Sequence, residues 1–319
     1  MYTKKHENNP IFVVKIGSSL VTKDGKGLDH TAIMQWSRQI AEIQTLGNCV
    51  ILLSSGAIAE GKQALNYNRE MKQPQRQAAA TLGQTRVTKA WEDALQNHGV
   101  SSAQILIKQE DIIDKKRYVH ARNLINELLK NGVVPVINEN ITLNPNEPII
   151  DNDTFGGLIS NLIEANHSLI LTDQKGFYTD DPRKNPQAKL IEKASAYDPS
   201  LISMAGDSAS DIGKGGMQTK LLSAQLAGLQ GTTTHIASGH EPNILTRLVN
   251  GELVGTALTG FPTEESRNSL KFDKHITSYL ISSGQLSRKY LENKQDDTNY
   301  VETFNREPIR KGLHPARWQ

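Results

Sequence analysis

Cysteine is almost missing from this sequence of 319 residues, which contains only Cys49. A single cysteine excludes an intrachain disulfide, and with it the class of small secreted proteins that disulfides hold together. Long apolar runs are missing too, since none approaches the roughly 18 residues that a membrane-spanning helix requires. Residues 1–10 are polar and lack the apolar core of a signal peptide. We therefore expect a cytoplasmic protein with no membrane segment.

The sequence also lacks a marked excess of charge of either sign. The chain has 36 Lys and Arg against 34 Asp and Glu, which gives a formal net charge of +2. This charge is too small to predict a nucleic-acid surface, so we expect no nucleic-acid partner. The nine histidines are scattered and show no pair at the spacing of zinc ligands. We therefore assign no metal-ligating residue.

Apolar runs and helical patterns alternate along the chain. Buried strands are predicted from continuous apolar runs, the last of them at 233–237, and the full set is 11–14, 49–53, 102–107, 133–137, 168–171 and 233–237. Helices are predicted between them at 28–46, 76–97, 116–130, 154–165 and 215–229. This alternation is typical of an α/β fold in which helices cover both faces of a mostly parallel sheet.

Polar motifs follow four of the predicted strands. They are Lys15-Ile-Gly-Ser-Ser19, Ser54-Ser-Gly-Ala57, Asn138-Glu-Asn140 and Thr172-Asp173. In open parallel sheets, ligands bind beyond the carboxyl ends of the strands. The four motifs therefore predict one polar active site at that edge of the sheet.

Two glycine-rich turns carry a lysine each. Lys15 precedes Gly-Ser-Ser, and Lys220 ends the run Gly213-Lys-Gly-Gly-Met-Gln-Thr-Lys220 that opens a predicted helix. Small residues leave main-chain N–H groups open to an anion, and lysine supplies a point charge for phosphate. Each lysine alone is more simply a surface residue. Together they favour phosphoryl transfer, in which positioning and charge neutralisation dominate.

The stretch Gly56-Ala-Ile-Ala-Glu-Gly-Lys-Gln63 nearly matches a phosphate-binding loop of the form Gly-x4-Gly-Lys-Ser/Thr. Gln63 replaces the hydroxyl residue that would hold magnesium, and residues 57–60 look helical. We interpret the match as accidental. Ser55 and Gly56 instead form a helix N-terminus, which suits a substrate carboxylate.

The triplet Asp151-Asn152-Asp153 has two interpretations. Asp and Asn are favoured helix N-caps, and a cap alone accounts for the composition. Two carboxylates exceed what a cap needs, so they could also orient lysines or bind a magnesium-bound nucleotide. The polar run 172–183 is in the same way either a surface loop or a contact for a base and ribose.

These motifs, taken in order, resemble the glutamate 5-kinase group of the amino acid kinase family. The resemblance runs colinearly from about Ile11 to Gly260 and is most specific in 171–183 and 205–220. It implies a single three-layer α/β/α sandwich with a mostly parallel central sheet. The implied reaction moves the γ-phosphate of ATP, with Mg²⁺, to the side-chain carboxylate of L-glutamate. This yields L-glutamyl 5-phosphate in the first step of proline biosynthesis, which proline commonly inhibits.

The resemblance also implies residue roles. Lys15 and Lys220 would neutralise the phosphoryl group in transfer, and Asp153 would orient them. Residues implied to bind ATP are Lys15, Thr172, Asp173, Lys214, Gly215, Gly216, Met217, Gln218, Thr219 and Lys220. On the glutamate side we expect Ser55, Gly56, Asn138, Ile141, Asp151 and Asn152.

The chain departs from the family pattern in three places. Ile141 stands where the family has an aspartate that contacts substrate, and Lys214 replaces a threonine in the second glycine turn. Gly156 and Gly157 weaken the predicted helix start. Because the first of these changes lies on the substrate side, the alternatives are a changed acceptor and a weakly active or non-catalytic sensor.

The resemblance also predicts how the chain divides. Residues 1–10 would be a polar extension, 11–263 the catalytic domain and 264–319 a polar tail. Many family members carry a C-terminal PUA domain of about a hundred residues. The tail is too short for a complete one. The family is usually oligomeric, so a homo-oligomer is expected.

Overall fold

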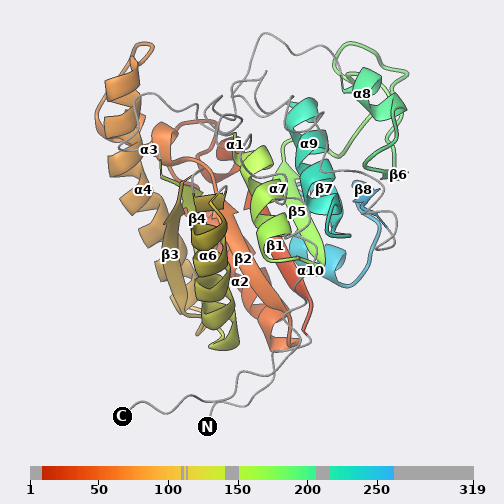
Figure 1. Ribbon diagram of the computed structural model, residues 1–319. Helices are drawn as coiled ribbons and strands as arrows, with labels where there is room; N and C mark the ends of the chain where they lie inside the picture. Colours follow the sequence, from red (N-terminus) through yellow and green to blue (C-terminus); the bar gives the residue numbers. More distant parts are fainter. Residues whose placement is uncertain (1–8, 109–110, 113, 141–150, 206–215, 262–319) are drawn as a thin grey trace, which may run out of the picture.

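The structure is a computed structural model that describes residues 9–108, 111–112, 114–140, 151–205 and 216–261 (Figure 1). The described elements are, in chain order, β1 (Ile11–Ile16), α1 (Ser18–Val21), α2 (His30–Thr45), β2 (Cys49–Ser54), α3 (Ala57–Ala64), α4 (Gln73–Gln96), β3 (Ser102–Ile107), α6 (Lys115–Lys130), β4 (Val134–Glu139), α7 (Asn152–Leu162), β5 (His167–Thr172), β6 (Lys193–Ser195), α8 (Ser200–Met204), α9 (Met217–Gly228), β7 (Thr233–Ser238), α10 (Ile244–Val249) and β8 (Thr256–Thr259). No helix in these ranges combines the length and apolar character needed to cross a bilayer.

A single sheet organises the described residues. Its strand order is β3-β4-β2-β1-β5-β7-β8-β6, and the strands from β3 to β7 in this order run parallel. β8 is antiparallel to β7, and β6 is parallel to β8. The predicted mostly parallel sheet is confirmed. Because β1 lies between β2 and β5, its carboxyl end is flanked by polar motifs on both sides.

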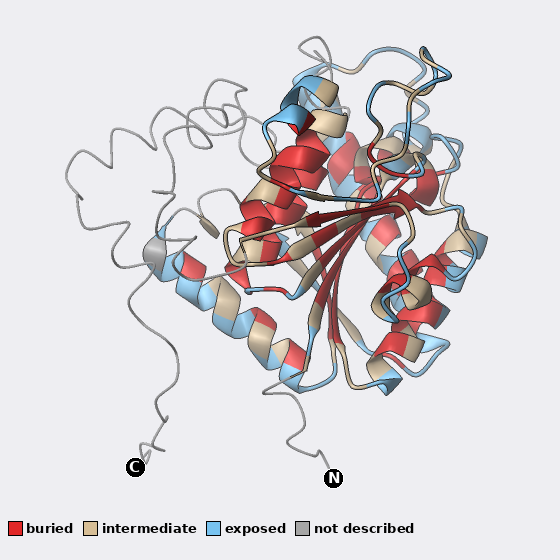
Figure 2. Cartoon of the chain, turned by 90° about the vertical axis from the view of Figure 1, so that its right-hand side faces the viewer, coloured by how far each residue is buried: buried red, intermediate tan, exposed pale blue. Residues whose placement is uncertain are grey.

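Alternation along β1 assigns its side chains to two different layers. Val14 and Ile16 pack in the cluster that includes Ile33 and Trp36 of α2, whereas Val13 packs with Phe155 and other residues of the opposite layer. Helices thus cover both faces, and Figure 2 shows the buried strands between them. The expected three-layer α/β/α sandwich is confirmed. Lys15 shares its face with Val13, so it points toward α7.

The prediction that 233–237 is the last strand is wrong. β8 follows it and pairs with β7, and β6 lies at the outer edge of the sheet. These strands have four and three residues. Such short segments produce no continuous apolar run, and an edge strand needs less burial than a central one. Only the pairing in space reveals them.

The contact between α7 and α9 explains the two glycines at 156 and 157. α7 begins at Asn152, two residues before the predicted start, so the glycines do not delay the helix. A Cβ on Gly157 would lie 2.5 Å from the carbonyl oxygen of Ser223 on α9. Glycine therefore lets the two helix backbones approach closely. This approach brings the first turns of α7 and α9 together (Figure 1).

Candidate active site

A buried ion triad lies where β1, α7 and α9 meet. Asp153 Oδ1 is paired with the ammonium group of Lys15, and Asp153 Oδ2 accepts a hydrogen bond from Lys220 Nζ at 2.9 Å. The Asp153 side chain is fully buried, and those of Lys15 and Lys220 are 8% and 6% exposed. The three residues predicted to act together are therefore in direct contact. Two ammonium groups against one carboxylate leave one net positive charge.

Each element contributes to this contact for a local reason. Lys15 is the fifth residue of β1 and lies on the face that α7 covers. Asp153 is in the first turn of α7, where a negative charge is favoured by the helix dipole. Lys220 is in the first turn of α9, one turn before Ser223. The close packing at Gly157 and Ser223 thus sets the distance between Asp153 and Lys220.

The charges on the triad shift the carboxyl pKa values in opposite directions. Burial alone raises the pKa of Asp153, but the charges of Lys15 and Lys220 and their hydrogen bonds outweigh it and hold that pKa well below its usual value. Burial, together with the negative charge of Asp153, raises the pKa of Asp151 despite two hydrogen bonds from Thr154. Asp153 is therefore ionised at neutral pH and is not suited to act as a base.

The interpretation of Asp151 as an N-cap is confirmed. Its Oδ1 accepts the backbone N–H groups of Asp153 and Thr154 at 3.0 and 2.9 Å, and its Oδ2 accepts the Thr154 hydroxyl at 2.5 Å. Both carboxylate oxygens are thus engaged by the first turn of its own helix. The two aspartates of the triplet have different contacts. Asp151 caps α7, whereas Asp153 pairs with both lysines. A role for Asp151 toward substrate stays a prediction.

The expected glutamate side lies along the same edge. Asn152 donates a hydrogen bond to Ser55 Oγ at 2.9 Å, which joins α7 to the end of β2. Gly56 has a φ of +104° and precedes α3, so its left-handed conformation suits glycine. Asn138 donates a hydrogen bond to Gln84 of α4 at 2.6 Å. Ile141 lies outside the described residues.

The expected ATP side begins at the end of β5. Thr172 donates a hydrogen bond to Asp173 at 2.9 Å. Burial raises the pKa of Asp173, but the hydrogen bond from Thr172, other hydrogen bonds and the Lys220 charge lower it overall.

The start of α9 holds the next residues of the expected ATP side, and Gly216, Met217 and Gln218 open this helix. The Thr219 hydroxyl lies 3.1 Å from Asp153 and 2.7 Å from the carbonyl oxygen of Gly216. Lys214 and Gly215 lie outside the described residues.

The segment that nearly matches a phosphate-binding loop lies in α3. Residues 57–60 are helical as predicted, and the helix continues to residue 64, so no loop wraps around an anion. Lys62 is exposed in the last turn of this helix and belongs to neither lysine pair of the triad.

Two residues next to the site were not predicted from the sequence. Thr154 contacts the cap residue Asp151, and Gln84 contacts Asn138 across 54 positions in the chain. Thr154 follows the acidic triplet directly, so its position next to a predicted cap was the available signal. Gln84 carries no such signal, because it lies in the middle of a long helix.

The described side chains of the candidate site do not form a metal centre of their own. Nowhere in the described ranges do three or more His, Cys, Asp or Glu side chains gather as metal ligands. The carboxylates present are engaged: Asp153 pairs with lysines and Asp151 with the α7 N-terminus. These side chains therefore suit an anion better than a free divalent cation.

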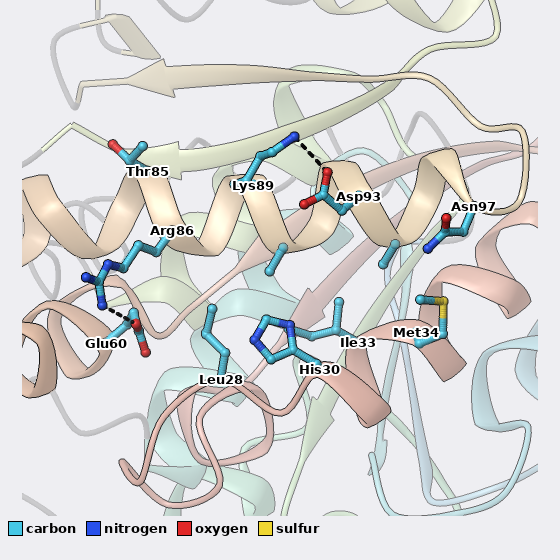
Figure 3. Close-up of a pocket in the computed structure, with 12 residues that line it drawn as sticks. Leu28, His30, Ile33, Met34, Glu60, Thr85, Arg86, Lys89, Asp93 and Asn97 are labelled. Atoms are coloured by element: carbon cyan, nitrogen blue, oxygen red, sulfur yellow. Dashed lines mark hydrogen bonds and ion pairs between the residues drawn. The ribbon is translucent and has the colours of Figure 1, made fainter.

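A groove of about 440 Å³ lies away from the triad, between α4 and residues 28–34 (Figure 3). Arg86 pairs with Glu60 at 3.1 Å and Lys89 with Asp93 at 2.7 Å along its rim. Leu28 and other apolar side chains also line it. None of the candidate site residues lines this groove, so it is separate from the buried triad and its neighbours.

Comparison with known proteins finds similar sequences and a similar fold. The chain is 50% identical over 248 residues to the glutamate 5-kinases of Burkholderia multivorans and Cupriavidus taiwanensis, covering 77% of this chain and 67% of each relative. Among solved structures, an isopentenyl phosphate kinase shares the fold with a TM-score of 0.55 at 19% identity, over 78% of this chain and 100% of that one. UMP kinase from Bacillus anthracis does so with a TM-score of 0.57 at 18% identity, over 78% and 96%. Residues 10–238 match the amino acid kinase family. On this match and on the 50% identity to these relatives, the chain belongs to the amino acid kinase family.

Proposed function

We propose that this protein transfers the γ-phosphoryl group of ATP to the side-chain carboxylate of L-glutamate, forming L-glutamyl 5-phosphate. The observation that carries the proposal is the buried triad of Lys15, Asp153 and Lys220, in which two ammonium groups meet one carboxylate. A desolvated positive charge is unfavourable unless an anion completes it. A transferring phosphoryl group is such an anion. The 50% identity to glutamate 5-kinases supports glutamate as the acceptor.

The reaction requires little proton transfer. The bond between the γ-phosphorus and the bridging oxygen of ATP breaks, and a bond forms from a carboxylate oxygen of glutamate to phosphorus. ADP leaves with the electron pair. Because a glutamate side chain with a pKa of about 4.3 is already ionised at neutral pH, no general base is needed. The contacts of Asp153 agree with a reaction that needs no base, because Lys15 and Lys220 hold both of its carboxylate oxygens.

The two lysines would act by electrostatic stabilisation. Asp153 keeps their ammonium groups at fixed positions at the carboxyl edge of the sheet. Such preorganised charges do not have to reorient as negative charge shifts from the γ-phosphoryl group to the leaving oxygen. Asp153 therefore serves as the group that orients both lysines.

Glutamate would bind on the side of β2 and β4. The Ser55–Asn152 pair supplies a hydroxyl and an amide, and the N-terminus of α3 after Gly56 presents free N–H groups to a carboxylate. Asn138 contributes its amide from the end of β4. The ATP phosphates would lie toward Thr172, Asp173 and the segment 214–220.

Magnesium would arrive with ATP. Mg²⁺ usually retains several waters and is held by substrate phosphates with one or two carboxylates, so it needs no cage of protein ligands. It would add positive charge at the β- and γ-phosphates. Proline inhibition, a homo-oligomer and a place in the cytoplasm are further parts of the proposal that rest on the family resemblance.

An assay of ATP turnover with a panel of amino acids and dicarboxylates tests this function. In the presence of hydroxylamine, an acyl phosphate made from glutamate is trapped as the hydroxamate. We expect ADP and hydroxamate to form in step and only with glutamate. Turnover with another acid alone would show a changed acceptor. Absence of turnover with every acid would favour a non-catalytic sensor.

A further inference from the structure

One helix, α4, contacts three parts of the chain around the expected glutamate side: the first turn of α3, Ser54 and Asn138. A Cβ on Gly83 of α4 would lie 1.8 Å from the carbonyl oxygen of Ala57, so α4 lies directly against the first turn of α3. Trp91 of α4 donates its indole N–H to Ser54 Oγ at 2.7 Å. Gln84 accepts a hydrogen bond from Asn138 at 2.6 Å. Figure 1 shows α3 and α4 side by side, next to the edge of the sheet.

The hydrogen bonds determine how the Asn138 amide is oriented. Its Oδ1 accepts the backbone N–H of Glu139 at 3.0 Å, which leaves Nδ2 to face Gln84 Oε1. A flipped amide would place its NH₂ group against that N–H, with donor facing donor. The Asn138 side chain is thus held at both of its polar atoms.

Gln84 is held in its turn. Its Nε2 donates to Thr88 Oγ1 at 3.1 Å, one turn further along α4. Thr88 also accepts Gln104 Nε2 at 3.0 Å, from β3 at the edge of the sheet. Gln84 therefore cannot exchange its oxygen and nitrogen without breaking the bond to Asn138. The chain of bonds gives Gln84 Oε1 one function, to accept from Asn138.

Asn138 retains one amide hydrogen. Nδ2 carries two, and Gln84 accepts one. Within the described ranges, no protein acceptor takes the second. In the register of β2 and β4, Leu53 pairs with Ile137, so Ser54 and Asn138 each come one residue after this pair. The next residue of the chain after Ser54 is Ser55, which contacts Asn152.

We infer that Gln84 is a positioning residue for glutamate, which directs the second amide hydrogen of Asn138 at an oxygen of the substrate. This inference rests on the proposed function. Gln84 touches no substrate atom in this scheme. It reduces the rotamer freedom of Asn138 before glutamate binds, and preorganisation of this kind improves binding without adding a contact.

The test compares Gln84→Met, which keeps the length of the side chain but cannot accept the bond, with Gln104→Met. Gln104 belongs to the same chain of bonds but does not reach Asn138, so its variant is the matched control. For Gln84→Met we expect the KM for glutamate to rise about three- to tenfold, the range expected for one hydrogen bond. We expect kcat and the KM for ATP to stay within about twofold. The lost hydrogen bond weakens the binding of glutamate equally in the ground state and in the transition state. The control should leave all three values unchanged.

A double variant separates positioning from general loss of packing. If Gln84 acts only through Asn138, then Gln84→Met should change the KM for glutamate by less than about twofold in an Asn138→Ala background. Thermal unfolding checks that each variant is folded. Gln84→Ala, which suits a helix interior, replaces the methionine variant if that one does not fold.

The outcomes are distinct. A KM for glutamate that stays within twofold in Gln84→Met, or a rise of equal size in the Asn138→Ala background, overturns the role of Gln84 and leaves the proposed function intact. If the unchanged protein does not phosphorylate glutamate, the proposed function fails, and the role of Gln84 fails with it.

Discussion

At the scale of single residues, Lys15 and Lys220 are unusual because both are buried and share one carboxylate. Asp153 is the partner that the two ion pairs have in common. Long charged side chains are seldom buried unless they are paired. Within the triad itself, the ammonium groups outnumber the carboxylates by one. A site for a polyanion explains this imbalance better than a contribution to stability does, since buried ion pairs often stabilise a fold little.

Removal of Lys220 should therefore impair turnover far more than binding. For Lys220→Ala we expect kcat to fall on the order of 100- to 1,000-fold, as for other preorganised groups that stabilise transition-state charge. Steady-state kinetics with glutamate and ATP provide the measurement. Lys62→Ala is the control, because Lys62 is exposed on α3 and should not matter. Near-normal turnover in the Lys220 variant would remove this lysine from the reaction.

Asp153 should also make stability depend on pH in a defined direction. Its pKa is lowered in the folded protein, so the stability it contributes is present above the unfolded value of about 3.9 and is lost as pH falls toward the folded value. Asp153→Asn leaves two lysines without their counter-charge and should destabilise by on the order of 3–5 kcal/mol near neutral pH.

Urea unfolding of both proteins between pH 3 and pH 7 measures this effect. The difference in unfolding free energy should be constant at higher pH and shrink below about pH 4. Asp151 acts in the opposite sense, because burial and Asp153 raise its pKa. The larger cause, burial of Asp151, is common to both proteins, so the comparison uses the difference between the two curves. A difference that does not change with pH would mean that the triad is not coupled to folding.

Ile141 bears on the choice of acceptor. The family resemblance places an aspartate there, whose carboxylate would meet the ammonium group of glutamate. A hydrogen bond to a charged group is worth roughly 1.5–3 kcal/mol, so Ile141→Asp should lower the KM for glutamate by about tenfold or more. If the acceptor has no ammonium group, the same change should harm the native reaction, because it introduces an unpaired charge. An unchanged KM would place Ile141 outside the pocket.

At the scale of elements, the packing of α7 on α9 decides the geometry of the triad. Asp153 and Gly157 are one turn apart on α7, as are Lys220 and Ser223 on α9. Separation of the helices at Gly157 would therefore separate Asp153 from Lys220. The position needs glycine for close approach, not for an unusual backbone conformation.

The neighbouring glycines provide a matched pair of variants. A Cβ on Gly157 would lie 2.5 Å from Ser223 O, whereas a Cβ on Gly156 would meet Lys15 Cβ and Cγ at 3.7 and 3.8 Å, which is ordinary contact. Gly157→Ala should thus lower both the melting temperature and kcat, the latter by about tenfold or more. Gly156→Ala should keep most of the activity. Equal behaviour of the two would contradict the role of this helix contact.

At the scale of the whole molecule, the described domain closes at its C-terminal end with β8. Thr256, Ala257 and Leu258 are buried there. Just beyond, Phe261 stacks on Tyr197 with ring centroids 3.9 Å apart and donates its backbone N–H to Gly228. These contacts make residues up to 261 part of the folded unit.

A chain that ends at Thr263 should therefore fold and keep most of its kinase activity, since every candidate site residue precedes position 221. Circular dichroism and the glutamate assay test this expectation. A chain that ends at Gly255 is the control, because it lacks β8 and should be insoluble or unfolded. Loss of activity at Thr263 would show that residues 264–319 support the catalytic domain or an assembly of it.

The sequence by itself determined where the central strands lie along the chain and where helices alternate with them. It also determined the motifs at the carboxyl edge, because apolar periodicity and glycine-lysine turns are local properties that burial and backbone freedom impose. Lys15 and Lys220 were identified in this way, whereas Asp153 was identified from the acidic triplet and the family resemblance. The cap formed by Asp151 was also within reach, since capping depends on neighbours in the chain.

Only the tertiary structure decided which of these residues touch. The pair of Asp153 and Lys220 spans 67 positions, and that of Asn138 and Gln84 spans 54. Neither has a local signal, because such contacts depend on how closely two helices pack and on the register of the sheet. The same reason hid β6 and β8, which pair at the edge although they are too short to form an apolar run. Gly157 shows the limit most clearly: a residue that weakens an isolated helix is the one that lets α7 and α9 bring the charged groups together.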